Sequence, residues 1–296
     1  MTGARPRRSL LFMPGTNARA MDKARGLAAD CLIFDLEDSV APDAKTQARV
    51  AIAAELARGG YGGRELVLRI NGLDTPWAED DLKVAARMKL DAVLLPKVAG
   101  EAAPRRADAI LTAAGAPARL GLWCMMETAR GVLHAEAVAA STPRLAALVM
   151  GTADLSKELR AAETPLREPM TIALGLCVLA ARAYGLAALD GVHFDLEDAA
   201  GFEASCRQGR ALGFEGKTLI HPKTIDAANA IFGPDASELS HARAVIAAHG
   251  AALAKGSGVA VLDGRLVERL HVEDAERLIA LAEAIAALES PGGRAS

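Results

Sequence analysis

Aromatic residues are scarce in this chain of 296 residues, since Phe, Trp and Tyr together make up only 3% of it. Hydrophobic residues nevertheless account for 51%, so a large core is available, and Ala, Leu, Val and Ile must fill most of it. This length and this composition suit either one large α/β barrel or two smaller domains.

The chain also lacks a strongly basic segment and a long apolar run. Its net charge is −3, and only the short stretch Arg5-Pro6-Arg7-Arg8 concentrates positive charge, which argues against a nucleic-acid-binding face. No apolar run approaches the roughly 20 residues of a membrane span. The run SLLFM after the N-terminal arginines is too short for the core of a signal peptide. We therefore expect neither nucleic acid nor a membrane among its partners.

Cysteines are few, and none is arranged as a CxxC pair. The four are scattered along the chain as Cys31, Cys124, Cys177 and Cys206. A free cysteine inside a strand-like run acts as a small hydrophobic residue. We expect four reduced thiols and, from them, a cytoplasmic protein.

What the chain does contain is a regular alternation of short apolar runs and helix-like segments. The runs are residues 9–13, 31–38, 65–71, 92–97, 120–126, 146–151, 186–192 and 216–221. Helices are expected at 18–28, 44–58, 77–88, 100–114, 129–140, 169–184, 199–212 and 222–231. The runs are apolar throughout, as parallel strands are when helices cover the sheet.

Eight such alternations predict a (β/α)₈ TIM barrel over residues 9–235, within an α/β fold class. The alternative is a doubly wound open sheet. The absence of GxGxxG after any strand counts against the dinucleotide-binding version of that alternative.

Segments at both ends lie outside the predicted barrel. Residues 1–8 are expected to be a disordered arm, and residues 290–296 a polar tail. Residues 236–289 form a C-terminal helix–hairpin–helix extension, with helices at 237–254 and 270–289 and an Asp263-Gly264 turn in a hairpin at 258–268. Because these elements cannot bury their own apolar faces well, we expect them to pack on the barrel or on a neighbouring subunit.

Polar side chains recur at the ends of the runs, at intervals of about one strand-plus-helix repeat. Barrel enzymes carry their active sites at the carboxyl ends of the strands, so these residues are predicted to share one rim. The set consists of Asp35, Glu37, Asp38, Arg69, Asn71, Lys97, Glu127, Asp154 and His221. Lys97 and His221 each adjoin a proline, and a structural role is the alternative for both.

Glu127 and Asp154 are the best candidates for a metal-binding pair. Each follows an apolar run, GLWCMM or ALVMG, and the two runs are consecutive strands of the predicted barrel. Mg²⁺ is typically held by one or two carboxylates together with water and substrate oxygens. The alternative for Glu127 is an acid that stabilises the start of the following helix.

Arg69 closes an apolar run, LVLRI, and therefore needs a carboxylate partner or an anionic ligand. A buried salt bridge to Asp35 or Glu37 is one interpretation, and it does not exclude contact with a substrate. Asp35, Glu37 and Asp38 are more acids than one Mg²⁺ needs. We expect these three to orient Arg69 or to hold metal-bound waters.

Seven ordered motifs carry a resemblance to a known family. They are RSLLFMPGTNARAMDKA, FDLEDSVAPDAK, LRINGLDTPW, LLPKV, METARGVLHA, GTADLSKELR and GFEGKTLIHPKTID. Together they resemble the citrate lyase β-subunit-like family, the CoA-ester lyases of the HpcH/HpaI aldolase superfamily. The resemblance runs from residue 7 to residue 288.

The resemblance implies a barrel with a C-terminal extension, assembled as a homotrimer or as a hexamer of two trimers. It implies Mg²⁺ held by Glu127 and Asp154, with Arg69 and Glu127 beside the substrate oxygens and CoA lying across the strand ends. The family's extension brings a catalytic aspartate into the neighbouring subunit's site. Here Glu268 stands at that position, and Ala153 stands where the family more often has asparagine.

The implied activity is a Mg²⁺-dependent CoA-ester lyase that cleaves or forms a carbon–carbon bond between an acetyl-CoA-type thioester and a small 2-oxoacid. Citryl-, malyl- and citramalyl-CoA are suitable substrates, because each has a hydroxyl and a carboxylate on one carbon that Mg²⁺ can polarise. Arg69 would offset negative charge on the oxygens, and Glu268 would move the proton.

Other activities stay open at this point. The same site suits a malate- or citramalate-synthase-like enzyme or a malyl-CoA thioesterase. A metal-dependent aldolase for free 2-oxoacids is a further alternative. So is a non-catalytic or carrier-dependent subunit of a citrate-lyase-like complex.

Overall fold

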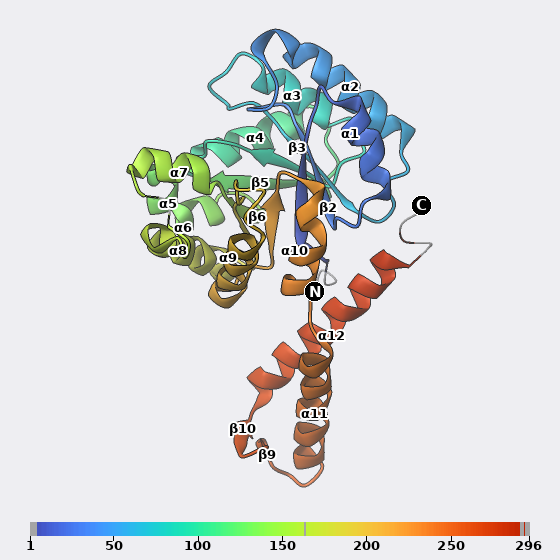
Figure 1. Ribbon diagram of the computed structural model, residues 1–296, viewed down its shortest axis with the longest axis vertical. Helices are drawn as coiled ribbons and strands as arrows, with labels where there is room; N and C mark the ends of the chain where they lie inside the picture. The colour runs from blue at the N-terminus through green and yellow to red at the C-terminus, as the bar shows by residue number, and fades with distance from the viewer. Residues whose placement is uncertain (1–4, 163, 291–292, 294–296) are drawn as a thin grey trace. The chain divides into compact units, whose positions relative to one another are not determined.

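The computed structural model describes residues 5–162, 164–290 and 293 (Figure 1). The described residues fall into two compact units, a larger one over residues 7–232 and a smaller one made mainly of residues 233–290. No helix in the described part of the chain is long and apolar enough to cross a membrane.

The larger unit is a closed barrel of eight parallel strands in sequence order. The barrel closes where β1 pairs with β8, in a register that sets Leu10 beside Thr218. This closure confirms the predicted TIM barrel and excludes the open sheet. The strands are β1 (Ser9–Pro14), β2 (Cys31–Asp35), β3 (Glu65–Arg69), β4 (Ala92–Leu95), β5 (Gly121–Met126), β6 (Leu145–Met150), β7 (Ala187–Asp190) and β8 (Gly216–Leu219).

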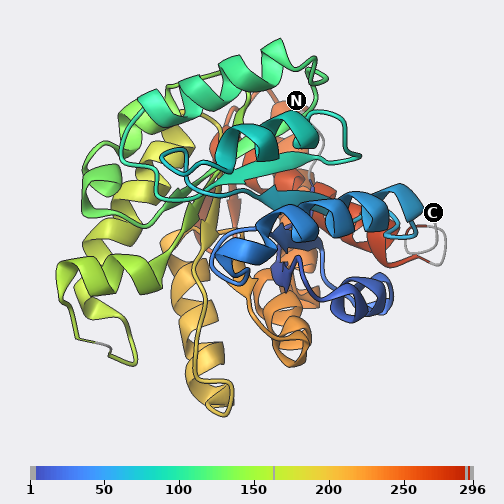
Figure 2. The same cartoon turned by 90° about the horizontal axis from the view of Figure 1, so that it is seen from above.

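Both faces of the strands are buried, which explains why the runs are apolar throughout. Alternate side chains enter two separate clusters. In β2, Cys31 and Ile33 belong to a cluster of strand residues inside the barrel. Leu32 and Phe34 pack in the larger cluster, which also contains residues of the surrounding helices. Figure 2 shows the helices arranged around the strands.

The helices of this unit follow the expected order with two departures. The segment 129–140 is two short helices, and an additional helix, α7, follows β6 directly. The α-helices are α1 (Ala18–Lys23), α2 (Lys45–Arg58), α3 (Ala78–Ala85), α4 (Ala102–Ala113), α5 (Ala129–Leu133), α6 (Ala135–Ala139), α7 (Thr152–Leu159), α8 (Thr171–Ala183), α9 (Ala199–Leu212) and α10 (Ile225–Phe232). Short 3₁₀ turns are η1 (Ala24–Gly26), η2 (Pro42–Ala44), η3 (Glu168–Met170) and η4 (Pro222–Thr224).

The prediction of a disordered arm is wrong for its last two residues. The Arg7 Nε lies 2.6 Å from Glu65 Oε2, and the Arg8 Nη2 lies 2.8 Å from Asp30 Oδ1. Arg8 is buried, and a buried guanidinium requires such a carboxylate partner. Residues 1–4 of the predicted arm lie outside the described residues, as does most of the predicted tail.

The smaller unit is a helix, a hairpin and a helix, as the sequence predicted. Its elements are α11 (Ala236–Leu253), β9 (Ala260–Leu262), β10 (Arg265–Val267) and α12 (Arg269–Glu289). Asp263 and Gly264 both have positive φ angles, 50° and 77°, as a two-residue type I′ turn requires. Its buried core is small and centres on Val245 and Val267.

Candidate active site

Arg69 is anchored at the carboxyl end of β3 by the acid that ends β2. The parallel register sets Asp35 beside Arg69. The Arg69 Nε donates to Asp35 Oδ1 at 2.6 Å, and the Nη2 donates to Asp35 Oδ2 at 2.8 Å. Both residues are buried. The salt-bridge interpretation of Arg69 is therefore correct for Asp35, and this two-point contact fixes the plane of the guanidinium.

Asp35 has no oxygen left over for a metal ion. Besides Arg69, the Ser39 hydroxyl donates to Oδ2 at 2.5 Å and the Glu37 backbone N–H donates to Oδ1 at 2.9 Å. Burial alone would raise the pKa of Asp35, but the hydrogen bonds and the charge of Arg69 outweigh burial and hold this pKa below its usual value. Asp35 is thus an ionised group that orients Arg69.

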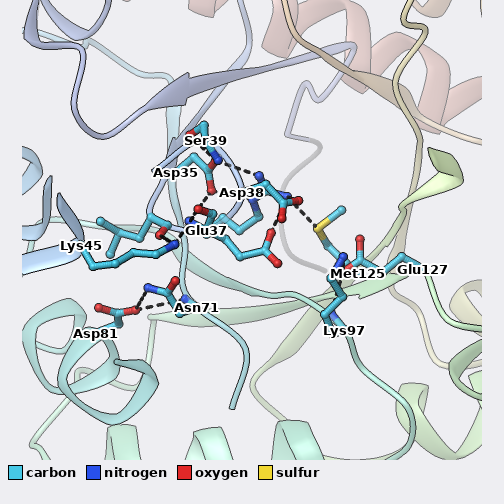
Figure 3. A network of polar contacts seen from close by, with 12 residues as sticks. Asp35, Glu37, Asp38, Ser39, Lys45, Asn71, Asp81, Lys97, Met125 and Glu127 are labelled. Carbon is cyan, nitrogen blue, oxygen red and sulfur yellow. Dashed lines mark hydrogen bonds and ion pairs between the residues drawn. The ribbon is translucent and has the colours of Figure 1, made fainter. Parts of the chain in front are cut away.

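The acidic loop after β2 brings two more carboxylates toward Arg69. The Arg69 Nη1 lies 3.0 Å from Glu37 Oε2 and 3.5 Å from Asp38 Oδ2. Burial, with the nearby charges of Asp38 and Glu127, raises the pKa of Glu37 to about 8, although Arg69 acts in the opposite direction. The Lys45 ammonium holds this loop in place by donating to the backbone oxygens of Leu36 at 2.8 Å and Glu37 at 2.7 Å (Figure 3).

Asn71 reaches the same rim but is already occupied by a neighbouring acid. Its backbone N–H and its side-chain amide both donate to Asp81 Oδ2, at 3.1 and 2.7 Å (Figure 3). Asp81 is also paired with Arg49, whose Nε lies 2.7 Å from Asp81 Oδ1. Asn71 therefore has a structural role at the end of β3.

Glu127 follows β5 and is buried, yet one of its oxygens has no partner. Its Oε1 accepts a hydrogen bond from the Lys97 backbone N–H at 2.6 Å. Its Oε2 is buried and, within the described part of the chain, has no hydrogen-bond partner. A buried carboxylate oxygen without a partner is costly and is often the mark of a bound ion or ligand. Burial, reinforced by the charge of Asp154, raises the pKa of Glu127 to about 7 despite Lys97.

The turn after β6 approaches Glu127 so closely that only glycine fits there. A Cβ atom at Gly151 would lie 2.4 Å from the Glu127 Cβ and 2.5 Å from its Oε2. Gly151 is also the N-cap of α7, so α7 begins directly beside Glu127. Asp154 lies in the first turn of α7 rather than at a strand end, and its carboxylate is partly exposed.

Lys97 joins the two predicted metal ligands. Its ammonium forms an ion pair with Asp154 Oδ2 and lies 3.7 Å from Glu127 Oε1. From the sequence, a structural role was the alternative for Lys97. The structure shows instead that Lys97 contacts both acids. Its position after β4, one repeat before Glu127, was the only signal for this contact. His221 does have a structural role, because its Nδ1 accepts a hydrogen bond from the Lys223 backbone N–H at 3.1 Å.

The chemistry of the two acids fits a magnesium ion. Carboxylate oxygens are the donors Mg²⁺ prefers, and one of them is the unpartnered Oε2 of Glu127. Among the residues that the structure describes, no group of three or more His, Cys, Asp or Glu side chains converges as a metal site would. Two protein ligands are the arrangement in which Mg²⁺ keeps several positions for water and substrate.

Glu268 belongs to the smaller unit, where it precedes α12. Its backbone N–H donates to His271 Nδ1 at 3.0 Å, which fixes the junction between β10 and α12. The side chain is half-buried within its own unit. Its predicted approach to the site of a neighbouring subunit stays a prediction.

A closed eight-stranded barrel with acids and an anchored arginine at its carboxyl rim defines a class of (β/α)₈ proteins. Within that class, the chain belongs to the HpcH/HpaI aldolase/citrate lyase family, whose model matches residues 8–222. This match confirms the family that the seven sequence motifs predicted.

Three similar proteins span nearly the whole chain. A (3S)-malyl-CoA thioesterase of Cereibacter sphaeroides is 50% identical over 287 residues, which cover 97% of this chain and 98% of that protein. An L-malyl-CoA/beta-methylmalyl-CoA lyase of the same species is 37% identical over 308 residues, covering 96% and 97%. The structure of CitE from Mycobacterium tuberculosis, in complex with magnesium, acetoacetate and coenzyme A, matches with a TM-score of 0.75 and 30% identity over 95% and 98% of the two chains.

Proposed function

We propose that this protein is a magnesium-dependent enzyme that acts on the CoA ester of a small hydroxy-dicarboxylic acid, with malyl-CoA as the first candidate. The observation that carries the proposal is the unpartnered buried Oε2 of Glu127 in a rim that also holds Asp154 and Arg69. Arg69 is near enough for its charge to act on the pKa of Glu127. The CitE complex with magnesium and coenzyme A, and the relatives named for malyl-CoA, support this choice.

Different side chains of the rim would bind the metal ion and stabilise charge on the substrate. Glu127 and Asp154 would hold Mg²⁺, which supplies Lewis-acid stabilisation of negative charge on the substrate oxygens. Arg69 offers a fixed positive charge, since Asp35 holds two of its nitrogens and the ring of Phe12 lies 4.7 Å from the guanidinium carbon. A preorganised cation of this kind stabilises charge that develops in the transition state.

Two reactions of the same substrate fit this site. Water attacking the thioester gives free CoA and malate, whereas loss of the hydroxyl proton and cleavage of the carbon–carbon bond give acetyl-CoA and glyoxylate. The 50% identity to a thioesterase over nearly the full length favours hydrolysis as the first candidate. The lyase reaction is the second candidate, because a lyase relative is 37% identical over a similar length.

A product assay distinguishes these reactions. The purified protein is incubated with malyl-CoA and Mg²⁺, and the products are separated by mass spectrometry. Free CoA with malate supports hydrolysis, and acetyl-CoA with glyoxylate supports the lyase. No product from malyl-CoA, citryl-CoA or citramalyl-CoA would contradict the proposal and favour the carrier-dependent subunit. Cleavage of an aldol product of a free 2-oxoacid, in the absence of CoA, would favour the aldolase.

We also propose that the smaller unit packs on a neighbouring subunit of a homotrimer or hexamer and contributes Glu268 there as the proton-transferring group. In support, the hairpin and the start of α12 expose apolar side chains, with Val261 71%, Leu266 53% and Leu270 55% exposed. Light scattering of the purified protein tests the assembly. The four buried free cysteines support a cytoplasmic location.

A further inference from the structure

Lys97 is held in an unusual conformation that aims two of its nitrogens at the predicted metal ligands. Its φ angle is 53°, in the left-handed region that a lysine rarely adopts. In this conformation its backbone N–H donates to Glu127 Oε1 at 2.6 Å. Its ammonium contacts Asp154 Oδ2 and lies 3.7 Å from that same Glu127 oxygen.

The acid pair Glu127 and Asp154 carries more negative charge than the cation beside it can offset. Glu127 and Asp154 contribute two carboxylates, and within the described residues the Lys97 ammonium is the one cationic group within 4.0 Å of either. Arg69 is paired instead with Asp35 at the end of β2 and with Glu37 after it. The Lys97 side chain is 38% exposed, so its ammonium can move into solvent, whereas Glu127 is buried and then needs another cation as its partner.

We infer that Lys97 is the internal counter-ion of the acid pair and that a divalent cation must displace its ammonium to be held by both carboxylates. This inference rests on the proposed function of that pair. The backbone N–H of Lys97 continues to orient Glu127, because it does not depend on where the side chain points. Lys97 therefore preorganises one ligand through its main chain while its side chain lowers the affinity for the cation.

Calorimetric titration of Mg²⁺ into the full-length protein tests the competition. Removing a positive charge within about 4 Å of the site should strengthen binding, so Lys97→Met and Lys97→Gln should each lower the dissociation constant roughly tenfold. Lys97→Arg, which keeps the charge, should stay near the wild-type value. The matched control is Lys157→Met, which removes an exposed lysine from the helix that carries Asp154 and should have little effect.

Thermal unfolding gives a second readout that does not depend on catalysis. In a chelator, Lys97→Met should melt below the wild type, because the two acids lose their counter-ion. Added Mg²⁺ should then raise its melting temperature by more than it raises that of the wild type.

The outcomes separate this inference from the proposed function. Wild-type binding that Glu127→Gln abolishes, together with unchanged or weaker binding in Lys97→Met and Lys97→Gln, would overturn the role of Lys97 alone. Mg²⁺ binding that is absent in the wild type, or that is unaffected by Glu127→Gln, would overturn the metal assignment and this inference with it.

Discussion

Gly151→Ala is the sharpest single test of the geometry around Glu127. The added Cβ would lie 2.4 Å from the Glu127 Cβ, whereas two non-bonded carbons sit best at about 3.5 to 4.0 Å. The backbone and the carboxylate must therefore separate by more than about 1 Å. The φ angle of Gly151 is −106°, outside the left-handed region that favours glycine, so the overlap with Glu127 is the main expected source of the penalty.

The expected cost has two parts that can be measured separately. Overpacking of this kind typically lowers the free energy of unfolding by about 1 to 3 kcal/mol, which urea denaturation measures. A misplacement of about 1 Å in an active-site group can lower turnover about 100-fold. We expect both losses, together with at least about tenfold weaker Mg²⁺ binding by calorimetry.

A matched glycine provides the control. Gly175 lies inside α8, and a Cβ there would meet nothing within 4 Å. Gly175→Ala should therefore raise stability by about 0.5 to 1 kcal/mol and leave Mg²⁺ binding unchanged. Wild-type Mg²⁺ affinity in Gly151→Ala would refute the argument that this turn and Glu127 are built around each other.

Three further predictions concern the charged residues. Glu127→Gln and Asp154→Asn should each abolish Mg²⁺-dependent turnover while circular dichroism stays that of the wild type; full activity in either variant contradicts the metal assignment. Glu127→Gln mixed with Glu268→Gln should regain activity if Glu268 acts in the neighbouring subunit, whereas each variant alone stays inactive; no recovery after subunit exchange argues against a shared site. The pKa of Asp35 is lower in the folded than in the unfolded protein, so its stabilising effect is present above the unfolded pKa and is lost as pH falls through the folded pKa. Asp35→Asn should lower the free energy of unfolding at neutral pH by about 3 kcal/mol, and that free energy should then fall less steeply with decreasing pH. Urea denaturation at a series of pH values measures both, and the same loss of stability in acid as in the wild type would rule this out.

The barrel was predictable because its strands carry a signal that does not depend on distant contacts. A run such as CLIF is apolar at every position since one face fills the barrel and the other lies under helices. The Asp263-Gly264 turn was predictable for a similar reason, because both positions need positive φ angles. The missed helix α7 begins at a glycine N-cap without a side-chain hydrogen bond, so the usual start signal is absent.

The site was only partly predictable because its contacts depend on how side chains reach across the rim. Sequence spacing predicted that Glu127 and Asp154 follow neighbouring strands, which they do, although Asp154 lies in the first turn of α7. It could not indicate the left-handed backbone of Lys97 that brings an ammonium between them. The ordered Arg8 was missed for a similar reason, since only the pairing of β1 with β2 brings its partner Asp30 near.

The rim has an excess of acid that bears on how a dicarboxylic substrate binds. Five carboxylates gather there, and Arg69 and Lys97 are the cationic side chains that contact them in the described residues. A substrate carboxylate entering this field would be repelled, and burial already raises the pKa of Glu37 to about 8 because the charged form is disfavoured. If Glu127 and Asp154 hold a divalent cation as proposed, the charge around them would become positive, and the displaced Lys97 ammonium could contact an anion. On this proposal, a substrate carboxylate would bind only after the divalent cation or together with it.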